Sequence, residues 1–168
     1  RTNAQSRVFE EVFLRSAIPY KVVGGVRFYE RKEVKDFLAY LRVLVNSEDE
    51  ISLRRIINTP KRGIGDRALD TVDLFAKDSG ISFWSALNRA ADVPSIPTRS
   101  ISAITDFVHL ITSLTVLVEA KTRPSIIAQA VLEQSGLLNE LEKSDDLQDE
   151  SRVENLQELV SVAVEYEE

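Results

Sequence analysis

The segment over residues 98–120 constrains the fold more than any other part of the sequence. Its large apolar residues recur every three or four positions, which places them on one face of a helix. They are Ile101, Ile104, Phe107, Val108, Ile111, Leu114, Leu117 and Val118. A long helix with one apolar face is typical of a helical bundle, in which that face points to the interior. The segment therefore predicts a mainly α fold.

Shorter segments on both sides show the same spacing and predict further helices. We expect helices over about 31–45, 51–58 and 151–166. A further helix should run from a bend near residue 65 to a C-cap at Gly80, another should begin after an N-cap at Ser82, and another should begin at Pro124. The acidic residues 144–150 predict a loop. Residues 20–23 alternate and are followed by Gly24 and Gly25, so one short β element is expected near residues 20–29.

Composition excludes several classes of site. Hydrophobic residues make up 43% and charged residues 29% of the 168 positions, as in an ordinary globular chain of one domain or one domain plus a fragment. There is no cysteine and one histidine, His109, so disulfides, thiolate sites and multi-histidine metal sites are excluded, and no metal site is expected. No signal peptide or bilayer-spanning apolar run is apparent, so we expect a cytoplasmic chain without a membrane partner.

The charges are distributed unevenly along the chain. Residues 1–67 carry 14 Lys and Arg against 9 Asp and Glu, a net of +5, whereas residues 68–168 carry 7 against 18, a net of −11. A basic first part and an acidic remainder suggest that only one face of the molecule meets phosphates.

The stretch from Asn58 to Arg67 is the main candidate site. Pro60 ends the preceding helix, and Gly63 and Gly65 permit positive φ and a close approach of backbone to a ligand. Asp66 is suited to cap the next helix, whose first amides are unpaired and lie at the positive end of the helix dipole. The stretch predicts a helix–hairpin–helix-like turn.

Cations flank that turn. Lys61, Arg62 and Arg67 would surround the amides of Gly63, Ile64 and Gly65, which indicates a clamp for a nucleic-acid phosphate that does not read base sequence. The alternative is a tight turn between helices with solvated charges. A second basic group, around Arg27 and Arg31, crowds the start of the helix over about 31–45, either to contact a phosphate backbone or to form ion pairs with neighbouring acids.

Five stretches in order resemble the UvrD/PcrA/Rep class of superfamily 1 DNA helicases. They are Arg1-Thr2-Asn3-Ala4-Gln5-Ser6-Arg7, residues 23–36, Ala39-Tyr40-Leu41-Arg42, Pro60-Lys61-Arg62-Gly63-Ile64-Gly65 and Arg152-Val153-Glu154-Asn155-Leu156. The resemblance covers nearly the whole chain. It implies that residues 1–45 are the edge of the RecA-like domain 2A, beginning at helicase motif IV, and that residues 46–168 are helical subdomain 2B.

Members of that class move 3′ to 5′ on single-stranded DNA, driven by Mg-ATP hydrolysis. The resemblance implies that Arg1 contacts the γ-phosphate of ATP, where a guanidinium can neutralise developing charge. It also implies that Gly63-Ile64-Gly65, with Lys61 and Arg62, touches the backbone of the duplex. The resemblance further implies that the segment around Arg27–Asp36 borders the single-strand track.

The sequence lacks the Walker elements, the adenine-stacking residue and helicase motifs V and VI. We therefore expect a piece of a longer protein, since the sequence holds no Met and opens on Arg1, and we expect no ATP hydrolysis, no unwinding and no cofactor in this piece alone. ATP and Mg²⁺ belong to the parent enzyme.

The predicted function is a DNA-binding accessory portion of a helicase in DNA repair or replication, which grips a duplex or a single-strand/duplex junction. The alternative is a helical module that docks repair or transcription proteins through its acidic second part.

Overall fold

The computed structural model describes residue 28 and residues 30–167, and within them the fold is mainly α, as predicted. The helices are α4 (Lys32–Val45), α5 (Glu50–Ile56), α6 (Asp66–Ser79), α7 (Phe83–Asn88), the short 3₁₀ helix η1 (Ala90–Asp92), α8 (Thr98–Glu119), α9 (Pro124–Gln134), α10 (Leu137–Glu142) and α11 (Leu147–Glu167). Arg1, Arg27 and the β element expected near residues 20–29 lie outside the described residues, apart from Phe28, which is buried and helical.

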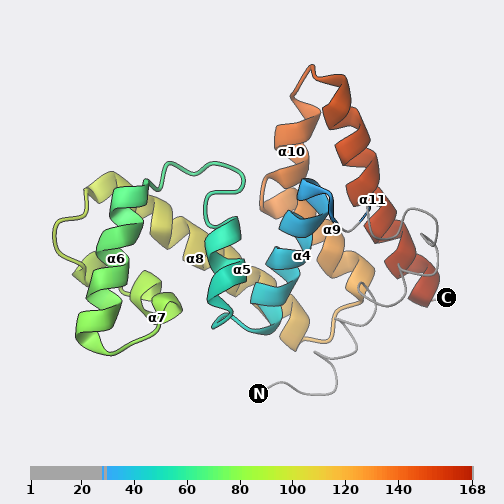
Figure 1. Ribbon diagram of the computed structural model, residues 1–168. Coiled ribbons are helices and arrows are strands. Elements are labelled where there is room, and N and C mark those ends of the chain that lie inside the picture. The colour runs from blue at the N-terminus through green and yellow to red at the C-terminus, as the bar shows by residue number, and fades with distance from the viewer. Residues whose placement is uncertain (1–27, 29, 168) are drawn as a thin grey trace.

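Helix α8 is the central element, as its long apolar face predicts. Ile104, Phe107, Ile111 and Leu114 are 0–1% exposed, and α8 packs against α4, α7 and α9 (Figure 1). Contrary to our expectation, this helix is long and apolar enough by length and composition to cross a membrane. A core helix of a globular protein passes the same test, and one face of α8 is buried among other helices while 33% of its most apolar window is buried in all.

Helix α4 is the second organising element. Its Val34, Phe37 and Tyr40 are fully buried, and it packs against α5, α8, α9 and α11. One continuous hydrophobic core therefore includes α4 together with the helices that follow residue 46. A short polar turn joins α4 to α5, where the Asp49 side chain accepts a hydrogen bond from the Ser52 amide and caps α5.

Polar contacts tie α11 to α4. The Asn155 side chain donates a 2.8 Å hydrogen bond to Glu33, and Arg152 lies 3.9 Å from the same carboxylate while also pairing with Asp149. Glu33 is buried, so these contacts satisfy a carboxylate that water does not reach freely. The stretch from Arg152 to Leu156 thus contributes to the packing of two helices that are distant in sequence.

Several helix ends follow the local signals, whereas the start of α11 does not. Gly80 ends α6 with φ +67°, the Ser82 hydroxyl accepts from the Ser85 amide at 3.0 Å, and Pro124 opens α9. The predicted loop over residues 144–150 is wrong in its second half, because α11 begins at Leu147. The Asp146 side chain accepts from the Gln148 amide at 2.9 Å, which allows the helix to begin inside the acidic run.

Candidate nucleic-acid interface

The candidate site is the bend over residues 57–65, which joins α5 to α6. Helix α6 packs against α7 and buries Ala68, Val72 and Ala76, whereas α5 packs mainly against α4 (Figure 1). The two helices beside the bend do not form a closely packed pair, so the helix–hairpin–helix detail of the prediction is not confirmed. The bend is a long arch between two parts of the helical core.

The two glycines of the bend have different roles. Gly63 has φ +80°, a left-handed conformation that glycine adopts without steric cost. Gly65 has φ −75° and ψ 162° and is itself the N-cap of α6. The expectation that Asp66 caps this helix is wrong, because Asp66 is the first helical residue and no side chain caps α6.

The backbone amides at this point are available to a ligand. No described residue accepts a hydrogen bond from the amides of Gly63, Gly65, Asp66 or Arg67. Gly63, Gly65 and the first residues of α6 are exposed, while the Ile64 side chain between the glycines is only 2% exposed. Ile64 therefore anchors the bend in the core and leaves the amides of its neighbours facing solvent at the positive end of α6.

Two of the predicted cations remain free beside these amides. Lys61 and Arg67 are exposed, and neither forms an ion pair with a described residue. Lys61 precedes Gly63 by two residues and Arg67 lies in the first turn of α6, so their charges flank the exposed amides on both sides. Unpaired amides with flanking cations form the donor set that binds a phosphate group.

Arg62 faces inward instead. Its guanidinium donates to the carbonyl of Ile56, the last residue of α5, at 2.8 Å and to that of the C-cap Ile57 at 3.1 Å. It also donates to the Tyr40 hydroxyl at 2.6 Å and to the Ser135 carbonyl at 3.2 Å. The prediction that Arg62 contacts a phosphate is at odds with this arrangement, because both terminal nitrogens are already bonded to protein.

Aromatic rings complete the surroundings of Arg62. Its guanidinium carbon lies 5.2 Å from the centre of the Phe107 ring and 6.0 Å from that of Tyr40, both within the range of cation–π attraction. These rings come from α8 and α4. We call Arg62 with Tyr40, Phe107 and Ser135 the Arg62 node; it joins the bend to three other parts of the core.

Asn58 holds the shape of the bend. Its side-chain oxygen accepts from the Ile64 amide at 3.2 Å and from the Arg62 amide at 3.4 Å, and its side-chain nitrogen donates to the Ile64 carbonyl. An asparagine side chain can bond nearby backbone in this way and stabilise a turn. Our sequence analysis missed this role, although an asparagine at the end of a helix and before a turn is a usable signal for it.

The corner between α9 and α10 supports the bend from the other side. A Cβ atom added to Gly136 would lie 3.2 Å from Cγ of Pro60, so the backbone approaches the proline ring closely here. Gly136 also has φ +91°, which favours glycine for a second reason. Pro60 and the Arg62–Ser135 bond thus place the bend against the start of α10.

Tyr40 lies fully buried beneath the bend and gives a pH-dependent prediction. Burial raises the pKa of its phenol, whose hydroxyl donates to the Thr59 carbonyl. Since folding favours the neutral phenol, this stabilisation is complete below about pH 10, the ordinary pKa, and is lost as pH rises through the raised pKa of the folded state. We expect the stability difference between wild type and Tyr40→Phe to shrink as pH increases above about 10. Urea unfolding across that range measures it, and a constant difference would contradict it.

The two glycines allow a matched stability test. A Cβ at Gly63 or Gly65 meets no atom within 4 Å, so only the backbone angles distinguish the positions. We expect Gly63→Ser to destabilise the chain by about 1–2 kcal/mol, the cost of a left-handed non-glycine residue. Gly65→Ser should leave stability unchanged or raise it slightly, because serine is a favourable N-cap. Equal losses for the two variants in urea unfolding would contradict this assignment.

The second basic group, at the start of α4, is divided between ion pairs and free charges. Lys32 pairs with Asp36 at 2.9 Å, and Arg55 pairs with the same buried carboxylate at 2.8 Å. Arg31 is exposed at the N-cap of α4, and no described acid pairs with it. The ion-pair alternative therefore holds for Lys32, while Arg31 keeps its charge at the surface.

The chain resembles known proteins over its whole length. The family model described as the UvrD-like helicase C-terminal domain matches residues 1–168. The chain is 52% identical to ATP-dependent DNA helicase UvrD1 of Mycobacterium tuberculosis over 99% of its own length and 22% of the relative's. It is 45% identical to ATP-dependent DNA helicase PcrA of Staphylococcus aureus over its full length and 23% of the relative's. The chain thus spans less than a quarter of these relatives.

Proposed function

Because the chain belongs to the UvrD-like helicase C-terminal domain family, we propose that it is the duplex-gripping accessory portion of an ATP-dependent 3′ to 5′ DNA helicase. Its relatives are named as ATP-dependent DNA helicases. In this proposal residues 1–45 are the edge of domain 2A, residues 46–168 form subdomain 2B, and the longer protein supplies the site for ATP and Mg²⁺, with Arg1 toward the γ-phosphate. The parent would act in DNA repair or replication.

The observation that carries the proposal is the exposed start of α6. The amides of Gly63, Gly65 and Asp66 donate to no described residue, and Lys61 and Arg67 flank them with unpaired charges. A phosphate of a DNA backbone matches these donors in charge and in hydrogen bonding. Such contacts fix the position of a duplex without reading its bases, so binding should not depend on sequence.

Arg62 has a positioning role in this proposal rather than a contact role. It fixes the bend to α4, α8 and the α9–α10 corner, so the amides are held in place before DNA arrives. A preorganised site loses less conformational entropy on binding than a loop that must first become ordered. Arg31 at the exposed N-cap of α4 is a further candidate for a phosphate contact.

The experiment is a salt titration of duplex binding. The 168-residue chain is mixed with two labelled duplexes of unrelated sequence, and fluorescence anisotropy measures affinity at several salt concentrations. We expect similar affinities for the two duplexes and a linear fall of log affinity with log salt, with a slope of about −0.9 for each phosphate contact. No binding, or an affinity that does not change with salt, would contradict the proposal.

A second candidate function, docking of another protein, is favoured by a separate observation. The turn from α10 into α11 carries an acidic pocket, which is distant in sequence from the bend and has the opposite charge to its cations. Protein docking at this pocket is compatible with duplex binding at the bend. The acidic pocket repels DNA phosphates, so a duplex would not occupy it.

A further inference from the structure

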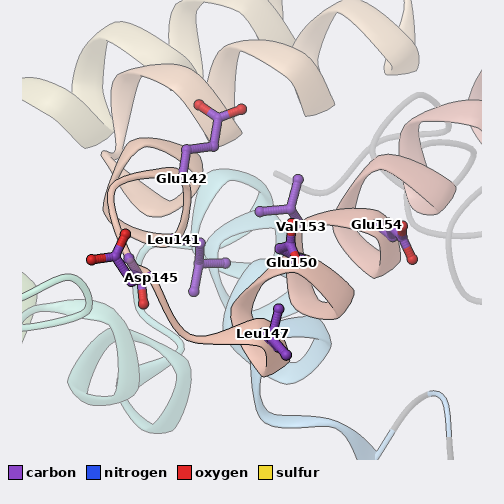
Figure 2. Close-up of a pocket in the computed structure, with 8 residues that line it drawn as sticks. Leu141, Glu142, Asp145, Leu147, Glu150, Val153 and Glu154 are labelled. Carbon is purple, nitrogen blue, oxygen red and sulfur yellow. The ribbon is translucent and has the colours of Figure 1, made fainter.

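The pocket between α10 and the first turns of α11 has an apolar part. Its volume is about 490 Å³, and its lining includes Leu141, Leu147 and Val153 (Figure 2). Leu141 and Val153 pack partly against the core, whereas Leu147 is 77% exposed. The pocket therefore presents an apolar floor and, at its edge, a large apolar side chain that the described part of the chain leaves uncovered. A contiguous apolar patch rimmed by polar residues is typical of an interaction surface, whereas a single exposed leucine is not.

The rim of the same pocket is acidic. Glu142, Asp145, Glu150 and Glu154 line it, and all four are exposed; Figure 2 shows them around the apolar side chains. No lysine or arginine is among the lining residues. The nearest basic residue along α11, Arg152, is already occupied by Asp149 and Glu33, so it does not neutralise the rim.

The arrangement of these acids selects the kind of ligand. Among the residues that the structure describes, no group of three or more acidic or histidine side chains is placed to hold a metal ion, so the carboxylates are spread around the rim. Spread negative charge around an apolar floor matches a chain segment that carries several cations and one apolar side. A nucleic acid would bring phosphates against these carboxylates, which is unfavourable.

We propose that this pocket docks a basic amphipathic helix of a partner protein. Apolar side chains of that helix would cover Leu147 and fill the space over Leu141 and Val153, and its lysines or arginines would face the four rim carboxylates. Helices bind grooves in this way through apolar anchors at positions i, i+3, i+4 and i+7. The proposal goes beyond duplex binding and uses none of the residues of the bend.

The test uses synthetic peptides and the whole 168-residue chain. The probe is a fluorescein-labelled helical peptide of about 14 residues, with leucines on one face and lysines on the other, and the comparison peptide carries glutamates in place of the lysines. The protein variants are Glu150→Gln with Glu154→Gln, and Leu147→Asn. The matched control is Asp70→Asn with Asp78→Asn, which removes two exposed negative charges from α6 instead.

We expect the lysine peptide to bind and the glutamate peptide not to bind. The glutamine pair and Leu147→Asn should each weaken binding about 10-fold or more, and the α6 control should change it less than about 2-fold. Equal losses in the α6 control would show general charge attraction and overturn the proposal. Unchanged binding by Leu147→Asn would also overturn it, because the peptide would then be held by its charges alone and not by apolar contact with the pocket. No binding at about 1 mM protein would overturn it outright.

The same variants separate this proposal from the duplex proposal. Glu150→Gln with Glu154→Gln should bind duplex DNA as wild type does, because these residues lie on α11 and not at the bend. A chain that binds the peptide but no duplex would refute only the duplex proposal, and the reverse result would refute only the docking proposal.

Discussion

Replacing Arg62 by alanine is expected to lower the free energy of unfolding by about 3 kcal/mol or more, although the residue lies in a loop. The change removes four hydrogen bonds of 3.2 Å or less to Ile56, Ile57, Tyr40 and Ser135. It leaves the Ile57 carbonyl at the C-terminal end of α5 without a donor among the described residues, and it removes the cation that lies over the Phe107 ring. Unsatisfied groups of this kind account for the large losses seen when one member of a buried polar network is deleted.

Urea unfolding of three variants measures this effect. Lys61→Ala, at the exposed neighbouring position, should change stability by no more than about 0.5 kcal/mol. Arg62→Lys should recover only part of the loss, because an ammonium group cannot reach several acceptors with the planar fork of a guanidinium. If Arg62→Ala unfolds like Lys61→Ala, the inward geometry of Arg62 is not what holds the bend.

Reversing the two free charges of the bend should have the largest effect on DNA binding. We expect Lys61→Glu with Arg67→Glu to weaken duplex affinity about 100-fold at low salt, because two attractive contacts become repulsive. The slope of log affinity against log salt should also fall by about 2 units, one for each lost phosphate contact. Neither residue has an ion-pair partner among the described residues, so folding should be unaffected.

A matched control isolates position from net charge. Lys77→Glu with Lys121→Glu makes the same change in net charge at the last turn of α6 and after α8. This pair should reduce affinity only slightly and leave the salt slope within about 0.5 units of wild type. Equal effects of the two pairs would place the contact elsewhere or show that only overall charge matters.

The helices could be predicted from the sequence because their signals are local. The spacing of apolar residues located α8, and Gly80, Ser82 and Pro124 marked helix ends that the structure confirms. The start of α11 was predicted too late because an acidic run resembles a loop, whereas the Asp146 side chain accepts a hydrogen bond from the Gln148 amide in the first turn of the helix. Both outcomes follow from contacts within a few residues of each other.

The role of Arg62 could not be predicted from local sequence. Its partners Tyr40 and Ser135 lie 22 and 73 residues away along the chain, so only the folded arrangement of α4 and α9 brings them together. From composition alone Lys61, Arg62 and Arg67 are three equivalent cations beside two glycines. The fold separates them into two that face solvent and one that supports the bend from inside.

The most direct test of the account follows the backbone amides themselves. Amide NMR signals of the ¹⁵N-labelled chain are recorded while a short duplex is added, and the titration is repeated with a duplex of unrelated sequence. The account predicts that the signals of Gly63, Gly65, Asp66 and Arg67 shift most, in the same pattern for both duplexes, while those of the acidic pocket over residues 141–154 stay unchanged. Shifts that leave these four amides unaffected and appear elsewhere would contradict it.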